Sequence, residues 1–185
     1  MTGKKARSWS DVKAVLQSRS PGELVTLVRD LYRLSADNRR YLHTRVLDVS
    51  AESEWYKRRV ADSIAPDITA HGQCKVRISD AKNAIRDYRL ASGDVAGTLD
   101  LMFTFVERGV DHYLDFGYDD EAFLQALVGM LDATMRMLAQ AGEDVQALGL
   151  PRMKGIGERA AEVGGSWEGI VADMISRDFP DLCAR

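Results

Sequence analysis

Apolar residues recur at three- and four-residue intervals along most of this chain, and that spacing constrains the fold more than any other feature. The clearest run is Leu24, Leu27, Val28, Leu31 and Leu34, which places five apolar side chains on one face of a helix. A strand that packs through one face would instead need apolar residues at alternate positions. The pattern therefore predicts amphipathic helices and an all-α protein.

Helix-start signals divide the first part of the chain into short helices. Ser20-Pro21-Gly22-Glu23 has the form of a capping box with Pro at the first helical position. Ser10 is expected to cap a short helix before it, and Ser35 a helix from about Ala36 to Val49, with Val46 on its buried side. A further helix is expected from Ser50 to the proline at position 66.

The rest of the chain shows similar helix-start and helix-stop signals. We expect helices over about 79–92, 94–116, 119–141 and 167–179, with a possible short extended segment at 74–78 and a broken, glycine-rich stretch at 149–165. Seven to nine helices joined by short loops favour αα-hairpins, in an irregular bundle or a HEAT-like repeat. We expect one domain over 1–185, with 1–7 as a flexible arm.

Composition supports a globular protein. Hydrophobic residues make up 45% and charged residues 29% of the chain. No apolar run approaches the ~20 residues of a membrane span, and the basic start is not followed by a signal-peptide core. The two cysteines, Cys74 and Cys183, form no disulfide framework, so we expect a cytoplasmic protein without membrane contact, although a bridge between them stays open.

Charge is distributed unevenly along the chain. Residues 1–89 carry 18 Lys or Arg and 11 Asp or Glu, whereas residues 90–185 carry 7 and 17. Such a division indicates either oppositely charged layers that pack together or on a second copy, or an anion-binding face on the first half.

The densest basic and aromatic group lies along 39–59. Its members are Arg39, Arg40, Arg45, Trp55, Tyr56, Lys57, Arg58 and Arg59. Guanidinium groups beside aromatic rings suit phosphate contact with base stacking, and they suit a protein interface equally well. The same residues could also be a solvated face with intramolecular ion pairs.

Other candidate sites have weaker support. The acidic residues Asp111, Asp115, Asp119, Asp120 and Glu121 form a possible cation patch, but carboxylates at this position more often cap helices.

His71 and Cys74 have a zinc-ligand spacing without a second pair, so no metal site is expected, and no cofactor motif is present. Residues 150–161 resemble a helix-hairpin-helix turn, in which Arg152, Lys154 and Arg159 would contact phosphate; an ordinary interhelical turn is the alternative.

The run LVRDLYRLSADNRRYL, from Leu27 to Leu42, resembles the opening of an uncharacterised family of small bacterial all-helical proteins. The stretches ISDAKNAIRDYRLAS, LDLMFTFVERGVDHYLDFG and DEAFLQALVGMLDATMRML resemble it as well. The resemblance implies a helical-repeat scaffold and no known activity.

No catalytic set of residues can be named from the sequence. We therefore expect a helical interaction or scaffold module rather than an enzyme, and we expect it to bind a protein partner or its own copy. The alternative is a nucleic-acid-associated accessory protein that uses the basic helices at 39–59.

Overall fold

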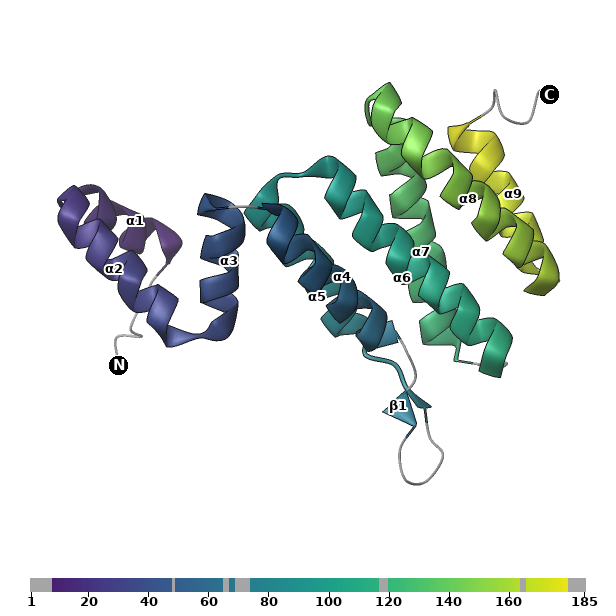
Figure 1. The fold of residues 1–185 in the computed structure, drawn as a ribbon, viewed down its shortest axis with the longest axis horizontal. Helices are drawn as coiled ribbons and strands as arrows, with labels where there is room; N and C mark the ends of the chain where they lie inside the picture. Colours follow the sequence, from purple (N-terminus) through teal and green to yellow (C-terminus); the bar gives the residue numbers. More distant parts are fainter. Residues whose placement is uncertain are drawn as a thin grey trace, which may run out of the picture.

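The computed structural model (Figure 1) describes residues 8–47, 49–64, 67–68, 74–116, 120–163 and 166–179 of the 185-residue chain. These residues form nine α-helices and one pair of two-residue strands, so the prediction of an all-α fold is confirmed. The elements are α1 (Trp9–Gln17), α2 (Pro21–Leu34), α3 (Ala36–Val46), α4 (Val49–Ile64), β1 (Asp67–Ile68), β2 (Cys74–Lys75), α5 (Ile78–Ser92), α6 (Val95–Phe116), α7 (Glu121–Ala139), α8 (Glu143–Val163) and α9 (Ser166–Asp178).

The helices form hairpins that stand side by side in an elongated array (Figure 1). α2 pairs with α3, α4 with α5, α6 with α7, and α8 with α9. Contacts of α6 with both α4 and α8 make one layer, and contacts between α3 and α5 and between α7 and α9 contribute to the other. The α1–α3 helices form a narrow arm at one end, and α6–α9 form the wide opposite end.

Local capping sets the helix starts in the arm. The Ser20 hydroxyl accepts from the Glu23 amide at 3.3 Å, and the Glu23 carboxylate accepts from the Ser20 amide at 2.9 Å, so the predicted capping box is confirmed. Ser35 caps α3, but α3 ends at Val46 rather than Val49. α1 begins at Trp9, two residues before the expected start, because Ser8 forms the box with an acidic residue three positions later.

The described part of the glycine-rich stretch, residues 149–163, belongs to a single helix. Predictions of a break near Gly149 and of a hairpin or turn over 150–161 are wrong, because α8 continues from Glu143 to Val163 with Pro151 inside it. Gly149 serves close packing instead: a Cβ there would lie 2.5 Å from Leu138 Cδ1 and 3.2 Å from Phe103 Cε2. Contacts with α6, α7 and α9 therefore outweigh the intrinsic preference of glycine for turns.

The hydrophobic core belongs to α4–α9. Among the described residues, every buried apolar side chain lies between Tyr56 and Met174. The largest fully buried side chains include Tyr88 on α5, Phe105 on α6 and Phe123 on α7. The wide end of the array is thus a packed helical body.

The arm contributes almost nothing to this core. Neither α1 nor α2 contains a buried residue, and Thr44 is the one buried residue of α3. Val46, which the helical pattern places on a buried side, is 69% exposed. That prediction is wrong, because the contacts of α3 with α2, α4 and α5 leave the Val46 side chain uncovered.

By length and composition, α7 could span a membrane, the one such case among the described helices. Seven of its side chains, including Leu127 and Leu131, are buried against neighbouring helices.

Candidate functional site

Trp55 is the centre of the predicted basic and aromatic group. The Arg40 guanidinium carbon lies 3.4 Å from the centre of the Trp55 ring, and that of Arg59 lies 5.1 Å from it. A cleft of about 230 Å³ opens beside the ring, between α3, α4 and α5. Because Arg40 covers the ring closely, the indole is already engaged in a cation–π contact.

Three of the six cations of this group form ion pairs within the described residues. Arg40 Nε donates to Glu52 Oε2 at 3.1 Å, and Lys57 Nζ lies 2.9 Å from Asp100 Oδ2. Arg59 reaches its partner Asp37 at a longer 3.8 Å. The remaining members, Arg39, Arg45 and Arg58, are exposed and have no ion pair within the described residues.

Tyr56 is not part of the surface. Its side chain is 4% exposed and packs edge-on against Tyr88, with ring centres 5.4 Å apart. Burial raises the pKa of the Tyr56 phenol, so the group stays neutral. The structure thus brings Arg40, Arg59 and Trp55 together and places Tyr56 beneath them in the core.

The predicted acidic patch is dispersed among local contacts. Asp111 pairs with Arg159 of α8, and Asp115 is exposed on α6. Asp120 caps α7 by accepting from the amides at positions 122 and 123, at 2.8 and 3.3 Å, and Glu121 accepts from Gln125. Asp119 lies outside the described residues. Capping and pairing therefore occupy most of these carboxylates.

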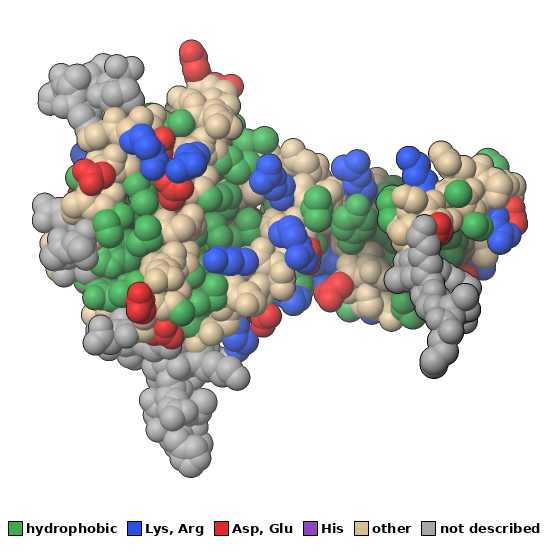
Figure 2. Space-filling view, turned by 180° about the vertical axis from the view of Figure 1, so that it is seen from behind, with side chains coloured by type: hydrophobic (Ala, Val, Ile, Leu, Met, Phe, Trp, Pro, Cys, Tyr) green, Lys and Arg blue, Asp and Glu red, His purple; other side chains and the backbone are tan. Residues whose placement is uncertain are grey.

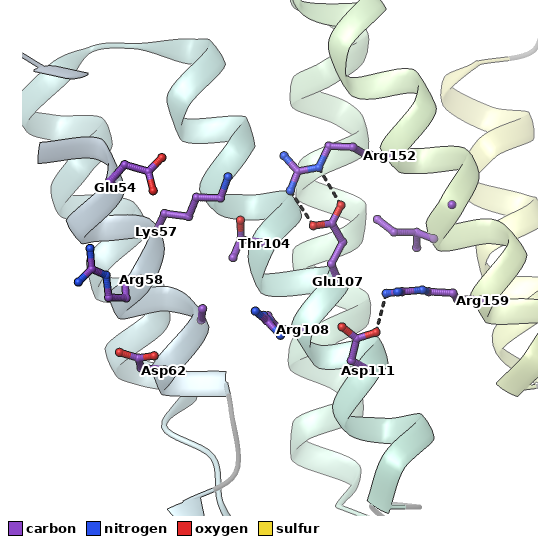
Figure 3. Close-up of a pocket in the computed structure, with 13 residues that line it drawn as sticks. Glu54, Lys57, Arg58, Asp62, Thr104, Glu107, Arg108, Asp111, Arg152 and Arg159 are labelled. Carbon is purple, nitrogen blue, oxygen red and sulfur yellow. Dashed lines mark hydrogen bonds and ion pairs between the residues drawn. The ribbon is translucent and has the colours of Figure 1, made fainter. Parts of the chain in front are cut away.

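A larger groove of about 680 Å³ crosses the layer formed by α4, α6 and α8 (Figure 3). Thr104, Ala61, Gly155 and Ile156 provide its small or uncharged lining. The charged lining residues are Glu54, Lys57, Arg58, Asp62, Glu107, Arg108, Asp111, Arg152 and Arg159.

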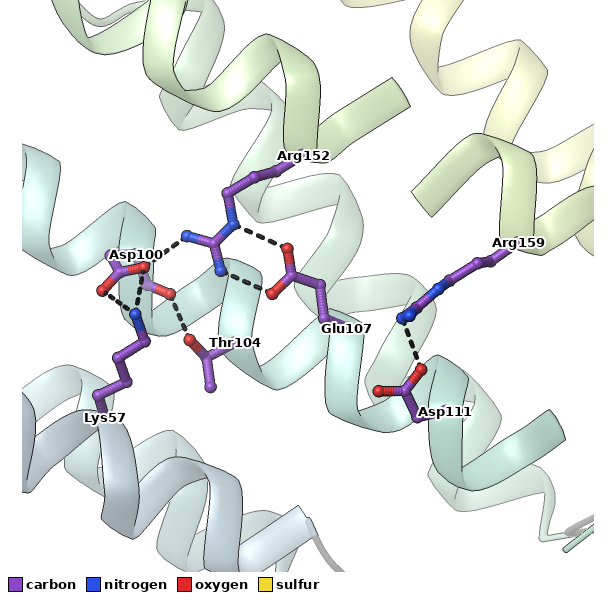
Figure 4. A network of polar contacts seen from close by, with 7 residues as sticks. All are labelled: Lys57, Asp100, Thr104, Glu107, Asp111, Arg152 and Arg159. Atoms are coloured by element: carbon purple, nitrogen blue, oxygen red, sulfur yellow. Dashed lines mark hydrogen bonds and ion pairs between the residues drawn. The ribbon is translucent and has the colours of Figure 1, made fainter. Parts of the chain in front are cut away.

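An ion-pair network ties the three helices of this groove together (Figure 4). Arg152 donates from Nε and Nη2 to the two carboxylate oxygens of Glu107, at 2.7 Å each, and from Nη1 to Asp100. Asp100 also holds Lys57 of α4, so one carboxylate links α4, α6 and α8. Burial opposes the charge of Arg152, but hydrogen bonds with Glu107 and Asp100 outweigh it and raise its pKa.

The groove offers few side chains that could act in catalysis. Its lining contains no His, Cys or Ser, and the Thr104 hydroxyl donates to the Asp100 carbonyl at 2.8 Å. A nucleophile with an adjacent base is therefore missing from these residues. Arg58 and Arg108 are exposed and have no ion pair within the described residues, but they share the groove with the carboxylates of Glu54 and Asp62.

Sequence reasoning missed the network, although a signal was present. Asp100, Thr104, Glu107 and Asp111 recur at helical spacing and form a polar stripe on the otherwise apolar 95–116 segment. Such a stripe indicates a helix that contacts charged partners.

No group of three or more potential metal ligands occurs among the described residues. His71 and Cys183 lie outside those residues, and only the backbone of Cys74, in β2, is described. The structure therefore tests neither the hypothesis of a zinc site at His71 and Cys74 nor that of a Cys74–Cys183 disulfide.

The most unusual surface is the apolar face of α1 and α2, which we call the arm face. Its large side chains are exposed: Trp9, Val12, Val15, Val25, Leu27, Val28, Leu31 and Leu34, at 43–76%. A groove of about 710 Å³ runs between the two helices, and its lining combines half-buried Leu16 and Leu24 with charged residues such as Glu23. The sequence pattern identified the stripe on α2, but only the structure shows that no described part of the chain buries it.

Comparison with models of known protein families, with curated proteins and with solved structures finds no match for this chain. The resemblance to the family of small bacterial helical proteins therefore stays an expectation.

Proposed function

We propose that this chain is a non-enzymatic interaction module that associates with a second copy of itself through the arm face. The observation that carries the proposal is that α1 and α2 contain no buried residue, although eight of their large apolar side chains are exposed.

The exposure of this surface is physically costly. Single exposed leucines are common, but folded monomers rarely expose contiguous apolar patches beyond a few hundred Å². On α2 alone, Val28 is 43%, Leu31 45% and Leu34 76% exposed. Burying such side chains contributes roughly 1.5–3 kcal/mol each when burial is complete, and this gain would offset part of the entropy cost of association through the arm face.

Charge favours a second copy as the occupant. Residues 8–47, which include α1–α3, carry seven Lys or Arg and four Asp or Glu, whereas residues 121–178, which include α7–α9, carry five and nine. Every copy therefore offers an acidic surface to the basic surroundings of the arm face of another copy.

Nucleic-acid binding is the second candidate, and the exposed cations Arg39, Arg45 and Arg58 favour it. The ion pairs of Arg40, Lys57 and Arg59 reduce the free positive charge of the same helices. If nucleic-acid binding is correct, a labelled oligonucleotide will bind to the protein at low salt. The triple variant Arg39→Glu/Arg45→Glu/Arg58→Glu will lose that binding.

Light scattering coupled to size exclusion tests the self-association. Over a concentration series, we expect the mass to rise from the chain mass of 20.6 kDa to twice that value. The double variant Leu27→Asp/Leu31→Asp should remain a monomer, because both charges would be desolvated in the interface. Its thermal midpoint, measured below the association range, should stay close to that of the wild type, because Leu27 and Leu31 are 43% and 45% exposed in the monomer.

Leu90→Asp is the matched control, because Leu90 is a 62% exposed leucine on α5, outside the arm face. It should associate as the wild type does. A wild-type chain that stays monomeric at every concentration, or a double variant that still dimerises, would overturn the proposal.

A further inference from the structure

The two ends of the elongated array carry opposite charge. The α1–α3 end has a balance of +3 over residues 8–47, and the α7–α9 end has a balance of −4 over residues 121–178. In Figure 1 these segments lie at opposite extremes of the molecule. We infer that two copies pair antiparallel, with the α1–α3 end of each on the α7–α9 end of the other; this inference rests on the proposed self-association.

Electrostatics separates this arrangement from the simplest alternative. Two arm faces could instead pack on one another, but that contact would place two basic ends together. Juxtaposed like charges cost several kcal/mol and suppress the corresponding complex. The antiparallel pairing brings each basic end against an acidic end, and it does so twice in one dimer.

The α7–α9 end offers apolar surface for the arm face to cover. Leu124, Val128 and Met137 of α7 and Ile170 of α9 are only half-buried, and Leu148 of α8 is 72% exposed. Figure 2, which views the molecule from behind, shows hydrophobic side chains gathered over the wide part of the molecule and a few separate ones on the narrow arm. Both ends therefore combine apolar side chains with charged ones, as interfaces with an apolar centre and a polar rim do.

Symmetry makes the assembly closed. When the α1–α3 end of one copy lies on the α7–α9 end of the other, a two-fold axis generates the reciprocal contact and no arm face is left over. A head-to-tail contact without that axis would leave one arm face uncovered at the end of an open chain. The inference therefore predicts a dimer and no larger species.

A pair of charge-reversed variants tests the arrangement. The arm variant is Lys13→Glu/Arg29→Glu/Arg33→Glu, and the end variant is Asp144→Lys/Glu162→Lys/Asp173→Lys. All six side chains are exposed, and Arg29, 4.0 Å from Asp30, is the one with an ion pair among the described residues. Circular dichroism and thermal midpoints of both variants should therefore stay close to those of the wild type.

Each variant alone should associate at least about tenfold more weakly than the wild type, because like charges then meet at both contacts of its dimer. An equimolar mixture should form a heterodimer with near wild-type affinity, because the reversed arm then meets the reversed end and the two native surfaces meet each other. Added salt should weaken the heterodimer, as it weakens pairing through charges at the rim of an interface.

The outcomes separate the two proposals. A wild-type chain that never dimerises overturns the proposed self-association. A wild-type dimer whose end variant also dimerises at full affinity contradicts the antiparallel pairing and leaves self-association standing, and so does a mixture that restores nothing. A mixture that grows beyond the mass of two chains identifies open head-to-tail assembly and equally rejects the closed dimer.

Discussion

Arg152 of α8 and Glu107 of α6 form a bidentate ion pair, with Arg152 Nε and Nη2 each 2.7 Å from a carboxylate oxygen. Through Asp100 the same guanidinium is connected to Lys57 of α4, so three helices from different hairpins share one network.

Loss of this pair should weaken the whole array. Glu107→Gln leaves the half-buried Arg152 beside a neutral amide, and we expect the free energy of unfolding to fall by about 1–3 kcal/mol. Chemical denaturation measures the effect. Arg19→Gln is the control, because Arg19, which precedes α2, and Glu23 of α2 are an exposed pair and should contribute within about 0.5 kcal/mol. Equal effects of the two substitutions would show that the network does not hold the array together.

Gly149 and Gly129 should respond in opposite directions to alanine. A Cβ at Gly149 would overlap Leu138, so Gly149→Ala should destabilise the protein by about 1–3 kcal/mol. A Cβ at Gly129, on α7, meets nothing within 4 Å, so Gly129→Ala should stabilise it by up to about 1 kcal/mol. Thermal unfolding of the two variants measures both signs. A stabilising Gly149→Ala would contradict the close approach of α8 to α7.

His112 should make the protein sensitive to acid. Its side chain is 2% exposed and packs against Phe123, and burial lowers the pKa of the imidazole in the folded state. The unfolded chain therefore binds a proton more readily than the folded chain. The contribution of a neutral His112 is complete above pH ~6.5 and is lost as the pH falls through that value toward the folded-state pKa.

Unfolding free energies measured between pH 7.5 and pH 5 test this prediction, with His112→Gln as the comparison. We expect the wild type to lose more stability than the variant over this interval. Parallel curves for the two proteins would exclude His112 as the source.

Ser20 should control α2 locally. Because α2 has no buried residue, its helicity in the monomer depends on the capping box, and Ser20→Ala should weaken it by about 1 kcal/mol. In the monomeric Leu27→Asp/Leu31→Asp background, hydrogen exchange should accelerate about fivefold over 21–34 and stay unchanged in α6. Faster exchange in α6 would mean that the arm and the helical body unfold together.

The Glu23 carboxylate of this capping box should stay ionised in mild acid. Hydrogen bonds from the Ser20 backbone and from Arg19 lower the pKa of Glu23 to about 2. The contribution of the ionised group is therefore present above its ordinary pKa and is lost only as the pH falls toward 2.

Much of the fold followed from interactions between residues close in sequence. The starts of α2 and α3 were predicted correctly because Ser20 and Ser35 form their caps within three residues. The end of α5 at Ser92 followed from Gly93, whose φ of 67° is a conformation that glycine adopts at little cost. Such signals operate before any tertiary contact forms, so they are visible in the sequence.

Tertiary packing decided the features that the sequence left open or suggested wrongly. α8 runs through Gly149 and Pro151 because its neighbours stabilise it by more than those two residues disfavour a helix. Arg152 and Arg159 serve ion pairs with α6 rather than a phosphate-binding turn, since their partners lie more than forty residues away in sequence. The amphipathic pattern of Leu27 and Leu31 determined that α2 is a helix with an apolar face. Only the arrangement of the described helices showed that this face is left uncovered, because periodicity specifies what a helix can bury and not whether a neighbour reaches it.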